Sequence, residues 1–475
     1  MKPFAIIGAG SAGMSAAYKL TEAGIQVEVF EATSDIGGLA RSISLWGQTV
    51  DIGPHRFFSK DKKINNFWLQ VAGKDYKMVN RLTRIYYNKR FFAYPLKPFN
   101  ALWNMGPVNA VLCFLSYLRQ LILPSFAPAE RTTFEAWVVT RFGWMLYKMF
   151  FKSYSEKLWG IPCTELDADF AAQRIKKFSL GQALKNALGL TRRKHNTLVD
   201  KFAYPLQGTG SIYKKMADYV EASGGKIHKN CPVKKVIVEN NQAKGVVTAK
   251  GERKDFAGVI STMPLTDLLQ GMDDLPAGLR KKLSLLTYRN TVLVYLEIDA
   301  VDLFPDNWLY IHAGELQVGR ITNFRNWVPE INNNKKTTII AMEYWCNESD
   351  PLWTQDDNIT IDTGKKEFYQ TGLLQKANII NTHLVKLHRC YPVYKTGYKD
   401  HLAPLITYLK KIKGLLPIGR YGSFKYNNQD HSILMGLLAA DNIINNSGHD
   451  LWHINTDYEN YQEESTISKV MADKG

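Results

Sequence analysis

The sequence predicts an α/β fold in which a dinucleotide-binding domain is interrupted by two insertions, one mainly helical and one built on an antiparallel sheet. Three observations predict it: a glycine fingerprint directly after an apolar run at residue 4, a helical stretch over residues 98–190, and strand-like runs between residues 285 and 350. Further strand-like runs between residues 226 and 262 return the chain to the first domain. We therefore expect the dinucleotide-binding domain to be discontinuous.

The N-terminal glycine fingerprint is the most specific of these observations. An apolar run, Phe4–Ile7, leads directly into glycines at positions 8, 10 and 13 and then into a helix-forming stretch. In a strand–turn–helix unit the first glycine permits a tight turn, the second lets the backbone approach a pyrophosphate, and the third lets the helix pack on the strand. The helix N-terminus faces the phosphates. The predicted phosphate contacts are Gly8, Gly10, Ser11, Ala12 and Gly13.

A second glycine pair distinguishes between dinucleotides. The next apolar strand ends at Glu31, 23 residues after the first glycine, where a carboxylate can accept hydrogen bonds from ribose hydroxyls. Gly37, Gly38 and Arg41 follow, and this spacing resembles the FAD motif of the glutathione-reductase-type flavoproteins. That resemblance implies further amides and a positive charge at the diphosphate. We therefore expect a glutathione-reductase-type Rossmann domain that binds FAD rather than NAD; a plain surface loop with a solvated arginine is the alternative.

The composition is that of a large globular protein. The 475 residues can bury a substantial core in two or three lobes, and the apolar and charged fractions, 45% and 22%, are ordinary for such proteins. The first strand begins at residue 4, so we expect no signal peptide. The five cysteines have no metal-ligand or CxxC spacing. We therefore expect no metal site and a reduced, cytoplasmic compartment.

The formal net charge of +16 calls for an anionic partner, or else serves solubility alone. The basic residues are dispersed and no nucleic-acid recognition module is readable, so no nucleic acid partner is expected. A diphosphate-bearing substrate together with an anionic membrane surface explains the positive charge more simply than nucleic acid does. The apolar stretch from Val108 to Leu123 is too short and polar to span a bilayer. It suits a helix at the inner face of a membrane, with an internal helix of the substrate lobe as the alternative.

The predicted elements divide the chain into five segments. A hairpin is predicted around Asn88 and Lys89, within the alternating run Leu82–Tyr94. We expect the FAD-binding domain to comprise residues 1–77, 201–270 and 406–475, the mainly helical substrate lobe residues 78–200, and the antiparallel-sheet substrate domain residues 271–405.

Four further segments resemble one family of flavoproteins, the UDP-galactopyranose mutases. They are Ser153–Gly160 with Glu165–Asp169 behind it, Gly53–His55, Val318–Thr322 and Gly419–Asp430. In those mutases reduced flavin attacks the anomeric carbon, and the nucleotide diphosphate leaves and is recaptured. The resemblance therefore implies pyranose–furanose ring contraction of a nucleotide-linked or lipid-linked sugar in cell-envelope polysaccharide synthesis. It also implies reduced FAD as the working cofactor, with NAD(P)H as a candidate reductant.

The same resemblance implies roles for individual residues. Arginines and tyrosine hydroxyls suit a departing diphosphate, because they give forked charge-assisted bonds and neutral donors. The implied catalytic residues are His55, Arg320 and Arg420, and the implied substrate-binding residues are Tyr154, Trp159, Arg174, Tyr391 and Tyr426. The implied cofactor-binding residues beyond the two glycine motifs are Gly53, His55, Val233, Gly419, Arg420 and Asp430.

Structural roles compete with these assignments, and two positions depart from the family pattern. Trp159 lies in an aromatic-rich segment and Tyr391 precedes a proline, so a core packing residue and a plain turn are the respective alternatives. Phe58 stands where the mutases carry a second histidine, and Asn428 stands near their acidic residue. An FAD oxidase, dehydrogenase or desaturase of the amine oxidase and protoporphyrinogen oxidase type is therefore the alternative function, and a non-catalytic flavin-bearing partner at a membrane assembly is a third.

Overall fold

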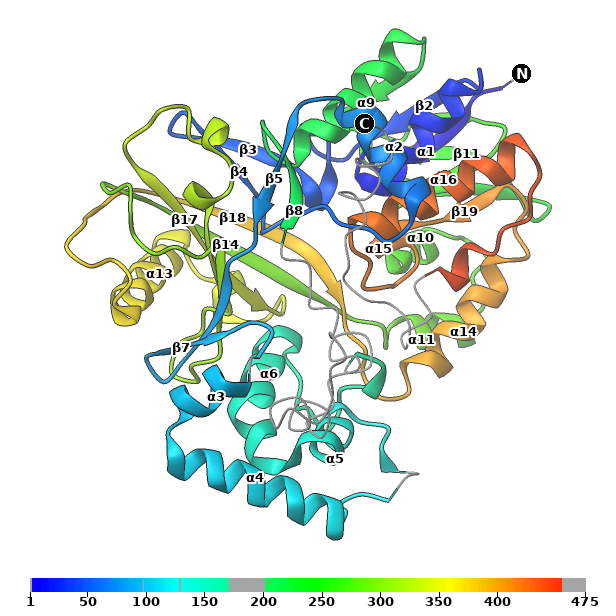
Figure 1. Ribbon diagram of the computed structural model, residues 1–475. Coiled ribbons are helices and arrows are strands. Elements are labelled where there is room, and N and C mark those ends of the chain that lie inside the picture. Colours follow the sequence, from blue (N-terminus) through cyan, green and yellow to red (C-terminus); the bar gives the residue numbers. More distant parts are fainter. Residues whose placement is uncertain (1, 97, 128–129, 171–200, 455–475) are drawn as a thin grey trace.

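The computed structural model describes residues 2–96, 98–127, 130–170 and 201–454. Its elements form three regions, seen in Figure 1: a parallel sheet with its helices near the N-terminus, a wide antiparallel sheet at the left, and a group of helices at the bottom. The predicted α/β fold class is confirmed, because chain segments far apart in sequence build the parallel sheet, and the helices and the antiparallel sheet are inserted between them.

The parallel sheet has five strands and carries the glycine fingerprint. In spatial order the strands are β19 (Leu415–Pro417), β13 (Val259–Ser261), β1 (Phe4–Ile7), β2 (Val27–Phe30) and β9 (Lys226–His228). The central strand β1 is apolar and largely buried, as expected for a parallel strand covered on both faces. Packed around this sheet are α1 (Ser11–Glu22), α2 (Lys62–Ala72), α9 (Gly210–Ala222) and α16 (Gln429–Ile444).

Close helix packing brings the C-terminal part of the chain to the fingerprint. A Cβ atom on Gly436 would lie 2.4 Å from the carbonyl oxygen of Ala12, so only glycine lets α16 approach the backbone of α1 this closely. One on Gly419 would lie 3.1 Å from the Ala12 Cβ. The loop that begins at Gly419 therefore lies beside the N-terminal turn of α1.

The second sheet has seven strands and forms a platform facing the other two regions. In spatial order they are β18 (Ile379–Pro392), β14 (Tyr288–Ile298), β17 (Thr338–Cys346), β16 (Arg320–Asn323), β15 (Trp308–Ile311), β6 (Thr83–Tyr87) and β7 (Arg90–Ala93). Neighbours are antiparallel except β15 and β6, which are parallel. The strand β17 is buried along its whole length, and α13 (Asp357–Thr371) packs on β14 and β18.

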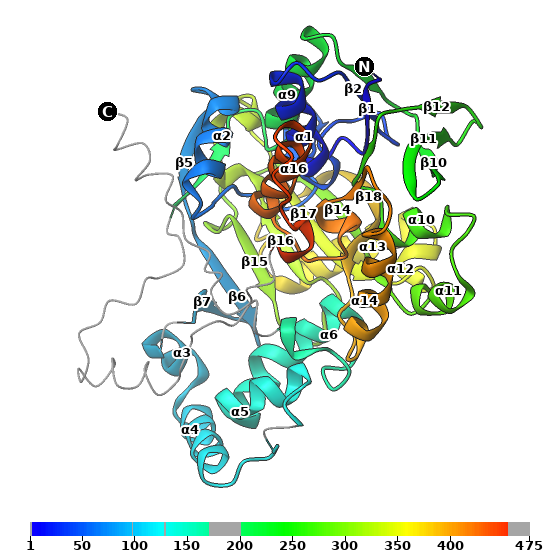
Figure 2. The ribbon, with the colours of Figure 1, turned by 90° about the vertical axis from the view of Figure 1, so that its right-hand side faces the viewer.

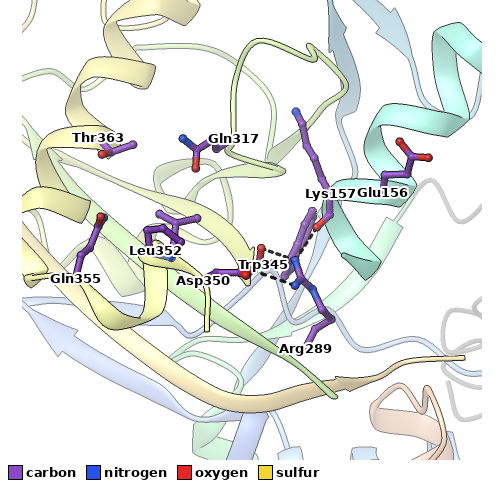
Figure 3. A pocket seen from close by; sticks show the side chains of 10 residues that line it. Glu156, Lys157, Arg289, Gln317, Trp345, Asp350, Leu352, Gln355 and Thr363 are labelled. Carbon is purple, nitrogen blue, oxygen red and sulfur yellow. Dashed lines mark hydrogen bonds and ion pairs between the residues drawn. The ribbon is translucent and has the colours of Figure 1, made fainter. Parts of the chain in front are cut away.

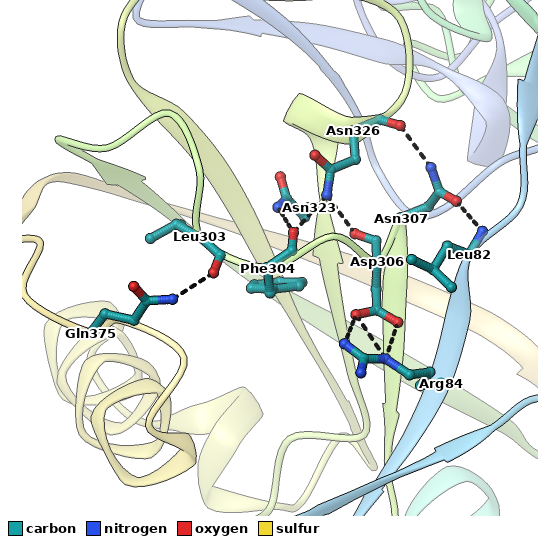
Figure 4. Close-up of polar contacts among 9 residues, drawn as sticks. All are labelled: Leu82, Arg84, Leu303, Phe304, Asp306, Asn307, Asn323, Asn326 and Gln375. Carbon is teal, nitrogen blue, oxygen red and sulfur yellow. Dashed lines mark hydrogen bonds and ion pairs between the residues drawn. The ribbon is translucent and has the colours of Figure 1, made fainter. Parts of the chain in front are cut away.

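The predicted hairpin around Asn88 and Lys89 is confirmed, and it extends this sheet. Strands β6 and β7 pair antiparallel, and the two turn residues have φ angles of 50° and 58°. Arg84 of β6 binds the fully buried carboxylate of Asp306 through two of its nitrogens (Figure 4). The hairpin therefore belongs structurally with the antiparallel sheet, although its residues lead into the helical segment of the chain.

A polar network joins the residue before β6 to the loop that precedes β15. Asn307 accepts a hydrogen bond from the Leu82 N–H (2.8 Å) and donates to the Asn326 carbonyl (2.7 Å). The Asn326 amide donates in turn to the carbonyls of Phe304 and Asp306 at 2.7 and 2.9 Å, as Figure 4 shows. Because buried carbonyls need partners, these side-chain amides stabilise an otherwise irregular loop before β15.

The helical insertion consists of α3 (Pro98–Met105), α4 (Pro107–Ile122), α5 (Phe134–Leu146), a π-helical segment (Tyr147–Lys152) and α6 (Ser153–Trp159). At Gly143, whose φ is 79°, a Cβ atom would lie 3.0 Å from the backbone of Ser116, so glycine permits the close approach of α5 to α4. Figures 1 and 2 both place α3 and α4 at the end of the molecule farthest from β1 and β2. Among the described residues, no helix combines the length and apolar character needed to cross a membrane.

Smaller elements complete the fold around the parallel sheet. The remaining strands form a three-stranded sheet, β10 (Val233–Glu239), β11 (Gln242–Thr248) and β12 (Arg253–Asp255), and two pairs, β3 (Ser42–Leu45) with β4 (Gln48–Asp51) and β5 (Tyr76–Asn80) with β8 (Lys201–Pro205). The remaining α-helices are α10 (Leu265–Gln270), α11 (Ala277–Leu283), α12 (Pro351–Thr354), α14 (Tyr398–Leu409) and α15 (Gly419–Gly422).

Candidate active site

Two of the three fingerprint glycines, Gly8 and Gly13, occupy positions where a side chain would not fit. Gly8 has a φ of +94°, and a Cβ atom there would lie 2.1 Å from Thr262 Oγ1. A Cβ atom on Gly13 would lie 2.0 Å from the carbonyl oxygen of Gly8, so helix α1 sits directly on the turn. The helix begins at Ser11 with Gly10 as its N-cap. The N-terminus of α1 is thus placed as a dinucleotide pyrophosphate requires.

The second glycine pair lies against the first. The Gly37 N–H donates to the Ala9 carbonyl (2.9 Å), and a Cβ atom on Gly38 would lie 2.9 Å from the Gly10 Cα. Arg41 follows after one turn of 3₁₀ helix and donates to the Gly38 carbonyl (3.2 Å). The two motifs that the sequence places about 28 residues apart therefore form one cradle of backbone.

The acidic residue after β2 closes this cradle. Glu31 is 7% exposed, and its carboxylate accepts from the Ala9 N–H (2.8 Å) and from the N–H and hydroxyl of Thr33 (2.9 and 2.8 Å). A carboxylate has about four acceptor positions, so these three bonds leave capacity for a ribose hydroxyl. The Glu31 carbonyl accepts from the Cys231 N–H, two residues before Val233. Val233 therefore begins β10 close to the backbone of Glu31.

The loop that carries His55 is shaped by Gly53 and held from beneath. Gly53 has a φ of +143°, and a Cβ atom there would lie 3.1 Å from the His55 imidazole. Thr209 Oγ1 donates to the His55 carbonyl (2.7 Å) and the Thr209 N–H donates to Asp51 (3.1 Å). The Asp51 carboxylate also accepts from Tyr204 (2.8 Å), and burial raises its pKa to about 6. The glycine-rich loop before α9 thus anchors the His55 loop.

His55 lies in the field of three arginines. Burial, together with the positive charges of Arg320, Arg420 and Arg41, lowers the pKa of the half-buried imidazole to about 3. The imidazole is therefore neutral at ordinary pH. Its Nδ1 atom is buried without a hydrogen-bond partner among the described residues. A ligand with a donor or acceptor at this point would satisfy that atom, and an anionic ligand would balance the arginines.

Arg320 is held by a carboxylate directly across the sheet. The register of β16 and β17 pairs Arg320 with Glu343, and Arg320 donates to Glu343 from Nε (2.8 Å) and from Nη2. The same carboxylate accepts from Trp345 Nε1 (2.9 Å) and from the Tyr391 hydroxyl (3.2 Å). Glu343 is 4% exposed at its side chain and Arg320 17%, so the pair is largely desolvated.

Arg420 spans two tyrosine rings. Its guanidinium lies 5.3 Å from the Tyr391 ring centroid and 4.8 Å from that of Tyr426, and the two rings stack at 5.5 Å. Its nitrogens donate to the carbonyls of Asn427 (2.9 and 2.6 Å) and Cys390 (3.3 Å). Arg420 therefore fixes the C-terminal loop to the end of β18. We call Arg320, Glu343, Arg420, Tyr391 and Tyr426 the arginine–tyrosine cluster.

Two aromatic residues of α6 border this cluster. Trp159 is fully buried, with its ring 5.9 Å from that of Tyr426 and 6.3 Å from that of Tyr391. Tyr154 stacks on His312 (4.7 Å) and meets Trp345 edge-on (5.6 Å). Burial raises the pKa values of Tyr154 and Tyr391, so both hydroxyls stay neutral donors.

The start of α16 meets the His55 loop. Asn428 is the N-cap of this helix, Asp430 is 5% exposed, and Gln429 bonds both to the Tyr213 hydroxyl (2.6 Å) and to the Arg56 carbonyl (3.4 Å). Most residues expected at the cofactor and substrate therefore gather in one region between the three parts of the fold. Arg174 lies outside the described residues.

Sequence reasoning missed Glu343 and Asp51, which hold the expected residues in place. Glu343 is a single acid within an otherwise apolar strand, and that pattern was the available signal, because a buried carboxylate is rare unless paired. Phe58 is buried beneath the guanidinium of Arg56, 4.7 Å from its ring centroid. The position of the absent second histidine is thus filled by a packed aromatic ring.

A cavity of about 410 Å³ lies on the other side of Trp345 (Figure 3). At its floor Arg289 donates to the carbonyls of Trp345 (2.7 Å) and Lys157 (3.2 Å) and lies 3.4 Å from the Asp350 carboxylate. Trp345 lines this cavity and also donates to Glu343, so one side chain connects the cavity with the arginine–tyrosine cluster. The residues that line it are Glu156, Lys157, Arg289, Gln317, Trp345, Asp350, Pro351, Leu352, Gln355 and Thr363.

The parallel sheet, the two glycine motifs and the acid at the end of β2 define a flavoprotein of the dinucleotide-binding class. The chain belongs to the flavin containing amine oxidoreductase family, whose model matches residues 11–352. A flavin cofactor follows from that membership.

The proteins that this chain is similar to include mutases and oxidases. The structure is similar to that of a reduced UDP-galactopyranose mutase, with a TM-score of 0.81 over 98% of this chain and 100% of that one, at 20% identity. A probable UDP-galactopyranose mutase of Klebsiella pneumoniae is 29% identical over 188 residues, which cover 38% of this chain and 46% of that protein. An L-amino-acid oxidase of Crotalus adamanteus is 34% identical over 111 residues, covering 20% of this chain and 22% of that enzyme. The chain thus aligns with less than half the length of these curated relatives.

Proposed function

We propose that this protein is a flavin-dependent mutase that interconverts the pyranose and furanose rings of a nucleotide-linked or lipid-linked sugar, in cell-envelope polysaccharide synthesis. The observation that carries the proposal is the arginine–tyrosine cluster beside neutral His55. Arg320, Arg420 and Arg41 all act on the His55 pKa, so three positive charges converge where the reacting diphosphate would lie.

The described residues fit a bound FAD. The fingerprint turn and the second glycine pair form a cradle that added Cβ atoms would fill. The buried Nδ1 atom of His55 has no hydrogen-bond partner among the described residues, so a bound cofactor can supply one. The glycine cradle would hold the diphosphate, Glu31 the ribose, and Arg41 would balance the phosphate charge. When bound and reduced, the flavin supplies a nucleophile for the anomeric carbon.

The chain's own residues would then bind and retain the substrate's diphosphate. Arg320 can offer a forked pair of donors, and Glu343 orients it across the strand pair. Tyr391 and Tyr426 add hydroxyl donors, which can hold an anion near the sugar by hydrogen bonds. Trp159 and Tyr154 bring apolar rings that exclude water and strengthen the electrostatic contacts.

An FAD-dependent oxidoreductase is the second candidate. It is supported by the similarity to an L-amino-acid oxidase and by the packed Phe58 in place of a second histidine. The two functions differ in electron balance, since a mutase consumes no net electrons whereas an oxidase transfers two to an acceptor with each turnover.

The experiment uses the full-length protein with FAD, reduced anaerobically with dithionite, and a panel of nucleotide sugars analysed for furanose products. A mutase is expected to be active only when reduced and to form far more product than the reductant that is oxidised. NAD(P)H is then tested in place of dithionite. Loss of one NAD(P)H or one oxygen molecule per product molecule would replace the mutase with the oxidoreductase.

A further inference from the structure

Helices α3 and α4 present an unusually apolar surface to solvent. Trp103 is 87% exposed, Val108 71% and Ile122 76%. Val111 and Leu115 are also more than half exposed and lie between these along α4. We call Trp103, Val108, Val111, Leu115 and Ile122 the outer apolar face. Single exposed apolar residues are ordinary, but a contiguous group of large ones marks an interaction surface.

The orientation of α4 is the reverse of that of an ordinary surface helix. Its buried residues are Cys113 and Gln120, while Val108, Val111, Leu115 and Ile122 form an exposed stripe at helical spacing. Two of the inward polar side chains form hydrogen bonds. Gln120 accepts from the Ser125 hydroxyl (2.8 Å), and the Ser116 hydroxyl accepts from the Met145 N–H (3.2 Å). The helix is therefore anchored through its polar side, which leaves the apolar side outward.

The surrounding segment is strongly basic. Residues 88–152 contain eight lysines and arginines and two acidic residues, a formal charge of 8 − 2 = +6. Lys89 and Arg90 lie at the tip of the β6–β7 hairpin, where Arg90 donates to the Asn104 carbonyl of α3. Arg119 is exposed and lies on the α4 stripe between Leu115 and Ile122. Long basic side chains there can place an aliphatic stem on apolar surface and a charge above it.

These features favour an anionic bilayer over a second copy of the chain. Two copies joined face to face would bring two segments of charge +6 together, whereas anionic headgroups complement that charge. An exposed tryptophan beside aliphatic residues is typical of helices that lie in the interfacial plane. Helices α3 and α4 lie at the end of the molecule farthest from β1 and β2, as Figures 1 and 2 show, so a planar surface can reach them.

We propose that the outer apolar face docks this protein on the surface of an anionic lipid bilayer, with α3 and α4 lying in the headgroup plane. Apolar side chains enter the acyl boundary, and the basic residues of segment 88–152 bind the headgroups. The proposal does not depend on the reaction catalysed at the arginine–tyrosine cluster.

The test is co-sedimentation of the full-length, FAD-loaded protein with phosphatidylcholine vesicles that contain phosphatidylglycerol, and with pure phosphatidylcholine vesicles. Binding is expected only with the anionic lipid and should fall as salt rises, because screening shortens the range of the charges. The double variant Val111→Ser/Leu115→Ser should bind at least about tenfold more weakly, since two buried aliphatic side chains are lost. Lys89→Gln should also weaken binding and reduce its salt dependence.

The matched control is Ile359→Ser/Ile380→Ser, because these residues are 55% and 48% exposed on α13 and β18, outside the helical region. It should bind vesicles like the wild type, and all variants should keep the wild-type FAD content. Equal binding by wild type and Val111→Ser/Leu115→Ser would overturn the proposal. So would recovery of the wild type in the supernatant with anionic vesicles at low salt. A dimer in light scattering that the same substitutions dissociate, without vesicle binding, would identify the face as a homodimer interface instead.

Discussion

Glu343 binds Arg320 and Tyr391 at once, so a single buried carboxylate joins two residues expected at the substrate diphosphate. Its partner Arg320 comes from the neighbouring strand, and Tyr391 comes from the end of β18. The carboxylate neutralises part of the positive charge that surrounds His55. A diphosphate entering the cluster would compete with Glu343 for the donors of Arg320.

Replacing Arg320 should lower kcat/KM, because the substrate diphosphate would lose a charge-assisted hydrogen bond. We expect Arg320→Ala to lower kcat/KM by about ten- to a hundredfold, the equivalent of a lost charge-assisted bond of roughly 1.5–3 kcal/mol. Arg320→Lys should recover only part of this, because lysine lacks the fork. Arg253→Ala, in exposed β12, is the matched control and should leave kcat/KM unchanged. Arg420→Ala should lower it similarly or alter FAD occupancy. Wild-type kinetics in both alanine variants would mean that the anion contacts lie elsewhere.

Replacing Glu343 should make the stability of the folded protein depend more strongly on a bound anion. Glu343→Gln leaves Arg320 without its counter-charge, so we expect a loss of roughly 1–3 kcal/mol of stability in the absence of ligand. Added UDP should raise the melting temperature of the variant more than that of the wild type, because the diphosphate supplies the missing negative charge. Uridine, which lacks the phosphates, is the control ligand. Identical UDP-induced shifts in both proteins would argue against a diphosphate at Arg320.

The parts of the fold predicted correctly are those fixed by local chemistry. The turn at Gly8, the helix after it and the strand ending at Glu31 lie within one short segment, where glycine placement and apolar runs dictate the conformation. The contact between Gly10 and Gly38 is consistent with this strand–turn–helix–strand unit, because both glycine motifs were expected at the same diphosphate. The hairpin at Asn88 was predicted for the same reason, since both turn residues tolerate a positive φ.

The long-range pairings could not be read from the sequence. Strand register decides that Glu343 faces Arg320, and a shift of one residue would turn the carboxylate to the other face of the sheet. The parallel pairing of β6 with β15 brings Arg84 to Asp306, which lies far away in the chain. Composition likewise marked the stretch from Val108 to Leu123 as apolar but left open whether it forms a membrane-surface helix or an internal helix of the substrate lobe. The sequence therefore named candidates, and register and packing determine their neighbours.

A fingerprint glycine should control cofactor content. Wild-type protein is expected to carry one non-covalent FAD per chain. A Cβ atom at Gly13 would lie 2.0 Å from the Gly8 carbonyl, so Gly13→Ala must push α1 from the turn and should abolish stoichiometric FAD. Gly278→Ala is the matched control, because it lies in exposed α11 with no atom within 4 Å of the added Cβ. Visible absorbance per chain after soaking with FAD measures both. A colourless wild type, or full FAD content in Gly13→Ala, would contradict the assignment.

Two histidines should make stability depend on pH between about 6.5 and 5. Burial lowers the pKa values of both His55 and His312 to about 3, below the value of about 6.5 in the unfolded chain. In this window the unfolded state therefore binds protons that the native state does not. The stabilisation is complete above about pH 6.5 and is lost as the pH falls toward 3. Asp51 acts oppositely, since its raised pKa of about 6 adds stability as the pH falls below that value.

His312→Gln isolates the histidine contribution, because His312 is 7% exposed and should carry the larger effect, on the order of 1–2 kcal/mol between pH 6.5 and 5. The half-buried His55 should contribute less in His55→Gln. Melting temperatures measured across this range should fall more steeply in the wild type than in His312→Gln, and the exposed His453→Gln should retain the wild-type slope. Parallel pH profiles for the wild type and His312→Gln would show that His312 takes up its proton in the folded protein.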